Sequence, residues 1–106
     1  MTDVRTLYLT AADEEQAAMI AEALLERGLI ACANVLPPMR SLYRWRGRTH
    51  DEGEVAMLLK TRADRVDEAI EAACEVHPYE EPCVVAWPIV AGAAPYLDWV
   101  RDACAP

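Results

Sequence analysis

Residues 39–60 read MRSLYRWRGRTHDEGEVAMLLK, and this stretch decides the fold. Successive side chains of a β-strand point to opposite faces of a sheet, so alternation between two kinds of residue predicts a strand. Residues 39–46 alternate between a largely aromatic face and a face rich in arginine, and residues 54–60 alternate again. Residues 47–53, bounded by glycines, supply the turn. The stretch therefore predicts a long β-hairpin.

Before the hairpin, the chain reads as strand, helix and strand. Residues 4–10 are rich in β-forming residues, and residues 29–36 form a mostly apolar run. Between them, Asp13 with Gln16 three places later is typical of a helix N-terminus, and Gly28 suits the end of that helix. Apolar residues at helical spacing form one side of the helix, which indicates that it packs on a core.

After the hairpin, the same order returns. A helix is expected from about Asp64 until Pro78 ends it, followed by a strand at residues 83–90. Pro88 cannot donate to a central ladder, so this strand lies at an edge or is bulged there. A short helix with Pro95 near its start closes the chain. The predicted fold class is α+β: a single-domain, ferredoxin-like split β-α-β sandwich with a long hairpin and a C-terminal helix.

Composition limits the partners and the location. The chain has 106 residues, with Lys plus Arg numbering 10 against 18 Asp plus Glu, a formal net charge of -8. Such a charge repels phosphate backbones, so we expect no nucleic-acid partner. The N-terminus lacks the pattern of a signal peptide and no apolar run approaches the ~20 residues of a membrane span, so we expect no membrane partner and a cytoplasmic location. The cysteines, at positions 32, 74, 83 and 104, are expected to be reduced thiols.

One face of the hairpin has no cover when both long helices pack on one side of the sheet. Depending on register, this face offers Met39, Tyr43 and Trp45, or Leu42. An apolar patch rimmed by charge is typical of a self-association surface, and the alternative is a solvated flank. Charge along the hairpin also has a self-complementary order, Arg40, Arg44, Arg46 and Arg48 followed by Asp51, Glu52 and Glu54. We therefore expect association with other copies of the chain.

The chain lacks the motifs of common catalytic sites. Its one serine, Ser41, lies in a strand pattern without a G-x-S-x-G elbow, and no glycine-rich loop is present to hold phosphates. Lys60, His77 and Tyr79 have the side-chain types for acid–base chemistry but no supporting spacing. We therefore predict no catalytic residue and expect the protein not to be an enzyme.

The densest polar cluster is HPYEEPC at residues 77–83. An imidazole and a thiolate suit copper or zinc, and a carboxylate can complete the shell, so His77, Glu80 and Cys83 are the predicted metal ligands. A closed site needs about four converging ligands, and two prolines restrict this loop. The alternative for His77 is a structural histidine favoured by the helix C-terminus. His50, in the hairpin turn, is expected to be exposed and without function.

A cleft between associated chains is the second candidate site. The residues expected to meet there are Trp45 and Glu54 of the hairpin, Lys60 and Arg62 of a strand end, and Tyr79 of the loop, with His77 beside them. With a lysine and an arginine in its wall, such a cleft favours a small anion.

Five short motifs together resemble the CutA divalent-cation tolerance family. They are ACANVLP at 31–37, SLYRWRG at 41–47, KTR at 60–62, HPYE at 77–80 and PYLDW at 95–99. The resemblance covers roughly residues 6–104. It implies a homotrimer of ferredoxin-like subunits whose hairpins extend one another's sheets, with a role in the response to copper or another divalent cation.

The chain departs from the family at two positions. Copper binding in CutA-like proteins has been linked to a cysteine at the end of the first strand and to paired histidines before the Pro-Tyr motif. Here Leu9 and Val76 occupy the cysteine position and the first histidine position, and only His77 remains. Two functions stay open: a metal-binding protein with weak compensation from the carboxylates and Cys83 of the loop, or a PII-like trimeric module that binds a small ligand.

Overall fold

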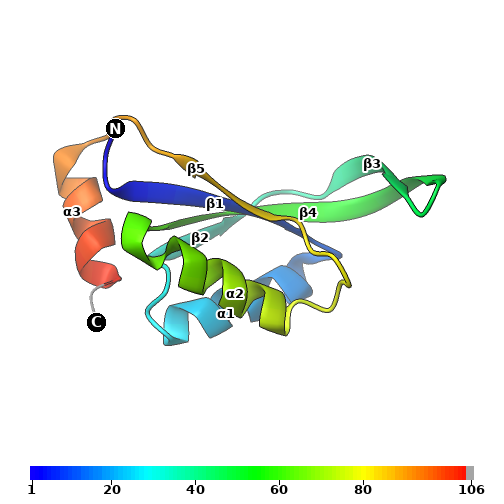
Figure 1. The fold of residues 1–106 in the computed structure, drawn as a ribbon, viewed down its shortest axis with the longest axis horizontal. Coiled ribbons are helices and arrows are strands. Elements are labelled where there is room, and N and C mark those ends of the chain that lie inside the picture. The colour runs from blue at the N-terminus through cyan, green and yellow to red at the C-terminus, as the bar shows by residue number, and fades with distance from the viewer. Residues whose placement is uncertain (105–106) are drawn as a thin grey trace.

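The computed structural model describes residues 1–104, and its centre is one antiparallel five-stranded sheet (Figure 1). The strands are β1 Val4–Ala11, β2 Cys32–Val35, β3 Met39–Trp45, β4 Arg48–Arg62 and β5 Val84–Pro88. Four of them lie in the order β2-β4-β1-β5, and β3 pairs with the other end of β4. This order, with one helix in each β-α-β half, is the ferredoxin-like arrangement, so the predicted fold class is confirmed.

Helices cover one face of the sheet and one end of it. Helices α1 Glu14–Glu26 and α2 Val66–Val76 lie side by side on the same face, whereas α3 Ala94–Ala103 lies at the end where β1 begins (Figure 1). A short 3-10 turn, Ala63–Arg65, leads into α2. The predicted helix start near Asp64 therefore falls in this turn. None of the described helices is long and apolar enough to cross a membrane.

Both ends of α1 follow the sequence signals. The Gln16 N–H donates to Asp13 Oδ1 at 2.8 Å, and the Ala12 N–H donates to Gln16 Oε1 at 2.9 Å. Gly28 has a positive φ of 68°, and the next N–H, of Leu29, still donates to a carbonyl of the helix. Because this turn uses residues 28–30, β2 is shorter than the strand predicted at 29–36.

The core lies between the sheet and the two long helices. In the strand register, Leu7 faces Leu59 and Leu9 faces Met57, and all four side chains are fully buried. Each such burial contributes about 1.5–3 kcal/mol to folding. Ile20 and Leu24 of α1 close the core from the helix side, whereas the neighbouring Leu25 is exposed. A smaller cluster, Val4, Leu97 and Val100, anchors α3.

The hairpin turn is shorter than the sequence suggested. Trp45 pairs with Arg48, so Arg46 and Gly47 alone form the turn, with φ values of 51° and 76°. Two positive φ values are the mark of a type I′ hairpin turn. The prediction that residues 47–53 form the turn is wrong, because these polar residues continue β4 as a strand paired with β3.

An extra residue joins β2 to β3. Val35 pairs with Met57 and Met39 pairs with Glu54, so three residues on one side oppose two on the other. Pro37 lies within this bulge, where no ladder N–H is required. The bulge keeps the aromatic face of β3 on the same side of the sheet as Glu54, opposite to the helices.

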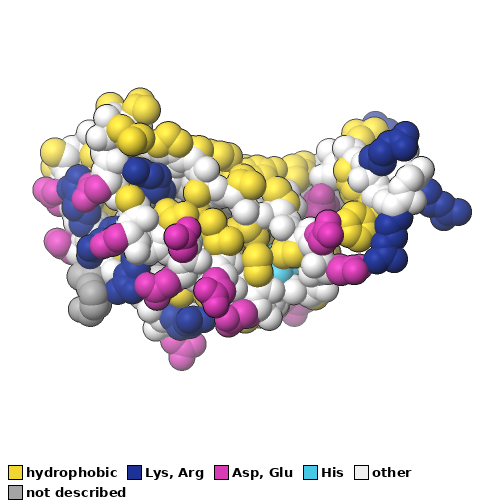
Figure 2. Space-filling view, in the orientation of Figure 1, with side chains coloured by type: hydrophobic (Ala, Val, Ile, Leu, Met, Phe, Trp, Pro, Cys, Tyr) yellow, Lys and Arg dark blue, Asp and Glu magenta, His cyan; other side chains and the backbone are white. Residues whose placement is uncertain are grey.

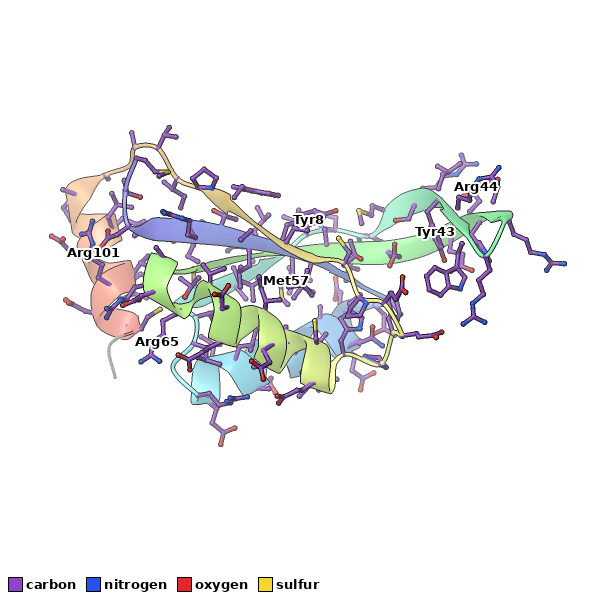
Figure 3. The ribbon with its side chains drawn as sticks, in the orientation of Figure 1. Tyr8, Tyr43, Arg44, Met57, Arg65 and Arg101 are labelled. Carbon is purple, nitrogen blue, oxygen red and sulfur yellow. The ribbon has the colours of Figure 1, made fainter. Side chains whose placement is uncertain are left out.

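The face of the sheet opposite the helices is here called the open face. It is apolar, and none of the described helices covers it. Tyr8 pairs with both Leu58 and Val85 across the strands, and its ring lies 5.7 Å from that of Trp87. Val85 is 49% exposed and Trp87 is 43% exposed. Figure 3 shows Met57 on the helix side and Tyr8 on the other side of the sheet, and Figure 2 shows apolar atoms along the saddle between the body and the hairpin. The predicted uncovered face is therefore present and extends beyond the hairpin.

Candidate functional site

A large cavity lies where the aromatic face of the hairpin meets the loop between α2 and β5. Its volume is about 790 Å³. The hairpin lines it with Met39, Arg40, Ser41, Leu42, Tyr43, Trp45 and Glu54, the loop with Tyr79, Glu80, Glu81 and Cys83, and β1 with Tyr8 and Thr10. We call this space the hairpin cavity.

Two tyrosines and two glutamates are hydrogen-bonded at the hairpin cavity. The Tyr79 hydroxyl donates to Glu54 at 3.1 Å, and the Tyr43 hydroxyl donates to Glu52 at 2.8 Å. Burial, together with the bond to Glu54, raises the pKa of Tyr79 to about 12. The bond to Glu52 raises the pKa of Tyr43 as well. Both phenols are therefore neutral donors that hold the carboxylates in place.

The Cys83 thiol lies at the edge of the same cavity. Partial burial and the negative charge of Glu54 raise its pKa. The thiol therefore stays protonated at neutral pH, unlike an activated nucleophile. The negative charge of Glu54 thus helps to raise the pKa values of both Tyr79 and Cys83.

The ring of His77 is buried, with 6% of its surface exposed. Nε2 lies 2.8 Å from the Thr10 carbonyl, which can only accept, so Nε2 donates. The Tyr79 N–H donates to Nδ1 at 3.2 Å. Both nitrogens are thus used inside the fold, and neither presents a free lone pair to a metal. This geometry supports the structural alternative for His77.

The three predicted metal ligands do not converge in one chain. Glu80 forms an ion pair of 2.7 Å with Arg46, and Cys83 is exposed. Across residues 1–104 there is no group of three or more His, Cys, Asp or Glu side chains placed to hold a metal ion. Leu9 is fully buried in the core and Val76 packs against it. A resident metal centre therefore does not fit a single chain.

The predicted cleft residues fall into two groups. Trp45, Glu54 and Tyr79 all line the hairpin cavity. Lys60 lies six residues further along β4 than Glu54, a distance of about 20 Å, and Arg62 forms an ion pair of 2.6 Å with Asp64. In a single chain the two cations are therefore at the other end of the sheet. Their meeting with Trp45 remains a prediction for an assembly of chains.

Several residues of the cavity were not predicted from the sequence. Tyr43 was assigned only to the uncovered face, although its position two residues before Trp45 places both rings on one side of β3. Tyr8 gave no signal, because its contact with the cavity depends on strand pairing. His50 is half-buried and stacks on Tyr43 with ring centroids 5.1 Å apart, so the prediction that it is exposed is wrong.

The family model and two relatives that match this chain all carry the name CutA. The family model described as CutA1 divalent ion tolerance protein matches residues 5–103. "Protein CutA homolog" of Xenopus laevis is 42% identical over 90% of this chain and 63% of its own length. "Divalent-cation tolerance protein CutA" of Thermus thermophilus is 40% identical over 91% of this chain and 93% of its own. The chain thus spans less than two thirds of the length of the frog protein.

A solved structure also matches. The crystal structure of CutA from Xylella fastidiosa superposes with a TM-score of 0.94 at 34% identity, covering 98% of this chain and 100% of that one. The sequence motifs, the sheet order and these matches agree. The chain belongs to the CutA1 divalent ion tolerance protein family.

Proposed function

We propose that the chain acts as a homotrimer in the tolerance of divalent cations, and that it takes up copper or a similar cation at the acidic side of the hairpin cavity. The observation that carries the preference for a cation is the negative field of the cavity lining, where Glu54 and Glu81 are acidic and the lining cation Arg40 is paired with Asp51. Such a field attracts cations and repels anions. A small anion, the other hypothesis, is not favoured there.

The open face supports association. It exposes aromatic and aliphatic side chains on a chain whose net charge is -8, and an apolar surface of this kind marks an interaction site. The number of copies, three, rests on the resemblance to the CutA family. In such an assembly the open faces would be covered and the hairpin cavity would lie near the seam between chains.

The cation would be held mainly by oxygen and sulfur ligands. Glu81 and Cys83 line the cavity and are exposed, whereas His77 has no free nitrogen. A thiolate ligand requires that Cys83 lose its proton, so uptake should strengthen as pH rises and release a proton. A neighbouring chain and water would supply the other ligands, because one chain does not bring enough of them together.

Titration calorimetry with copper(II) tests this proposal. Glu81→Gln and Cys83→Ser should each weaken copper uptake by about tenfold or more, as loss of one of a few ligands does. Glu71→Gln and Cys74→Ser are matched controls, since both side chains are exposed on α2, outside the cavity lining. Undiminished copper uptake in both cavity variants would contradict the proposed site.

We further propose that the protein works in the cytoplasm and without catalysis. All four cysteines are free thiols, which suits a reducing compartment. Cell fractionation checks the location; recovery in an oxidising compartment would contradict it.

A further inference from the structure

The walls of the hairpin cavity are largely aromatic. Tyr43 and Trp45 project from one face of β3, and Tyr8 and Tyr79 approach from β1 and the loop. The faces of aromatic rings carry partial negative charge and attract cations. The Arg46 guanidinium carbon already lies 5.3 Å from the Trp45 ring centroid, which shows this attraction within the chain. A volume of about 790 Å³ is suitable for a small organic molecule.

Negative charge dominates the lining of the cavity. Glu54, Glu80 and Glu81 contribute carboxylates. Arg40 is the one lining cation among the residues described, and Asp51 neutralises it through two bonds of 2.8 and 2.6 Å. Glu54 also contributes, after burial, to the raised pKa of Tyr79. Glu80 is paired with Arg46 at 2.7 Å, so a ligand that enters would meet ring faces and the carboxylates of Glu54 and Glu81.

We propose that the hairpin cavity binds an organic cation, an alkylammonium or alkylguanidinium group, with its charge at Glu54 and its apolar chain against Tyr43 and Trp45. A bare divalent ion needs several converging donors, and the described chain offers no group of three. An organic cation needs only one carboxylate and a ring face, both of which the cavity has. The inference rests on the acidic cavity of the proposed function but assigns it a different class of ligand.

The cation has two possible sources. One is a free organic cation, and the other is an arginine side chain from a second copy of the chain. Arg44 and Arg48 are exposed near the hairpin tip, and Figure 3 shows Arg44 directed away from the body. Both sources present the same chemistry to Glu54 and the rings, so the test must separate them.

The test is calorimetric titration of the assembled protein with N-butylguanidinium in the presence of EDTA, which removes free metal ions. N-butylurea, a neutral molecule of the same shape, is the matched control ligand. Saturable binding of the cation is expected, at least about tenfold tighter than that of the urea, because only the cation forms a charge-assisted bond to Glu54.

Variants then place the ligand. Glu54→Gln should weaken butylguanidinium binding by about tenfold, and Trp45→Leu by about three- to thirtyfold through loss of the ring face. Glu71→Gln and Trp99→Leu, at exposed positions on α2 and α3, should change it little. If Trp45→Leu does not fold, the indole N–H resonances of the wild type serve instead, and only the Trp45 signal should shift.

The outcomes are distinct. Equal affinity for butylguanidinium and butylurea, or affinity unchanged by Glu54→Gln, overturns the inference. Binding by an Arg44→Gln/Arg48→Gln variant but not by the wild type keeps the ligand class and identifies a second copy as its source. The inference is also overturned if neither the wild type nor the Arg44→Gln/Arg48→Gln variant binds butylguanidinium. Copper uptake that depends on Glu81 and Cys83, without uptake of butylguanidinium, leaves the proposed function intact and removes this inference alone.

Discussion

The two faces of the sheet are both apolar, but only one is covered by the chain itself. On the helix side, Leu59 is fully buried. Its neighbour Leu58, on the open face, is only half-buried, and Val85 across the sheet is 49% exposed. A sheet with one face in water usually alternates apolar with polar residues. The difference teaches that these strands suit a sheet covered on both faces, with the second cover supplied from outside the chain.

The largest predicted effect compares two adjacent leucines. Leu59→Ala should destabilise the folded chain by about 2–5 kcal/mol, because it opens a cavity in the core. Leu58→Ala should destabilise a single chain by much less and act on association instead. Urea unfolding at several protein concentrations separates the two effects. Equal losses that do not vary with concentration would show that the two faces are not different.

The hairpin turn provides the next test. It joins β3 to β4, and the aromatic side chains of β3 extend the open face. Gly47→Ala should destabilise the protein by about 1–2 kcal/mol, since a side chain at positive φ is strained. Gly53→Ala is the matched control, because Gly53 has no positive φ and open space surrounds its Cβ position. A similar loss in both variants, measured by thermal unfolding, would rule out backbone strain at Gly47 as the cause.

A smaller effect is expected on the covered side. Asp13→Ala removes the bond to the Gln16 N–H and should lower stability by about 1 kcal/mol. Because α1 lies on the helix side, the variant should associate like the wild type. Circular dichroism on heating and sedimentation measure the two properties. Loss of association in this variant would argue that the two faces are coupled.

The smallest effect concerns alkaline pH. The pKa of Tyr79 is raised from an ordinary 10.0 to about 12, because burial and Glu54 favour the neutral phenol. Its contribution to stability is therefore complete below pH 10.0 and is lost as pH rises through about 12. Tyr79→Phe should reduce the fall in unfolding free energy across this range. An unchanged slope would mean that Tyr79 does not titrate as described.

The periodicity predicted the fold because each element carries a local signal. The alternation in β3, the cap at Asp13 and the left-handed Gly28 are properties of a few neighbouring residues. The extension of β4 to Arg48 was hidden, since its polar residues resemble a turn and Arg-Gly is not a usual hairpin pair. The bulge near Pro37 depends on pairing with a distant strand, which no local pattern reveals.

The site was only partly predictable for the same reason. Trp45, Glu54 and Tyr79 were predicted together and do line one cavity. The sequence could not show that both nitrogens of His77 are hydrogen-bonded within the fold, because one of its partners, Thr10, lies 67 residues away. The sequence also did not reveal that the electrostatic field of the hairpin cavity is negative. Lys60 lies far along β4 from the cavity, so the acidic residues determine the sign of this field.

The central claim is that other copies of the chain cover the open face, and sedimentation equilibrium tests it most directly. The wild type should have three times the 11.8 kDa mass of one chain at micromolar concentration. Val85→Asp, which places a charge on the open face, should yield folded monomers, whereas Leu25→Asp, at an exposed position of α1, should leave the mass unchanged. A wild type that sediments as a single chain, or a Val85→Asp variant that stays assembled, would contradict the account.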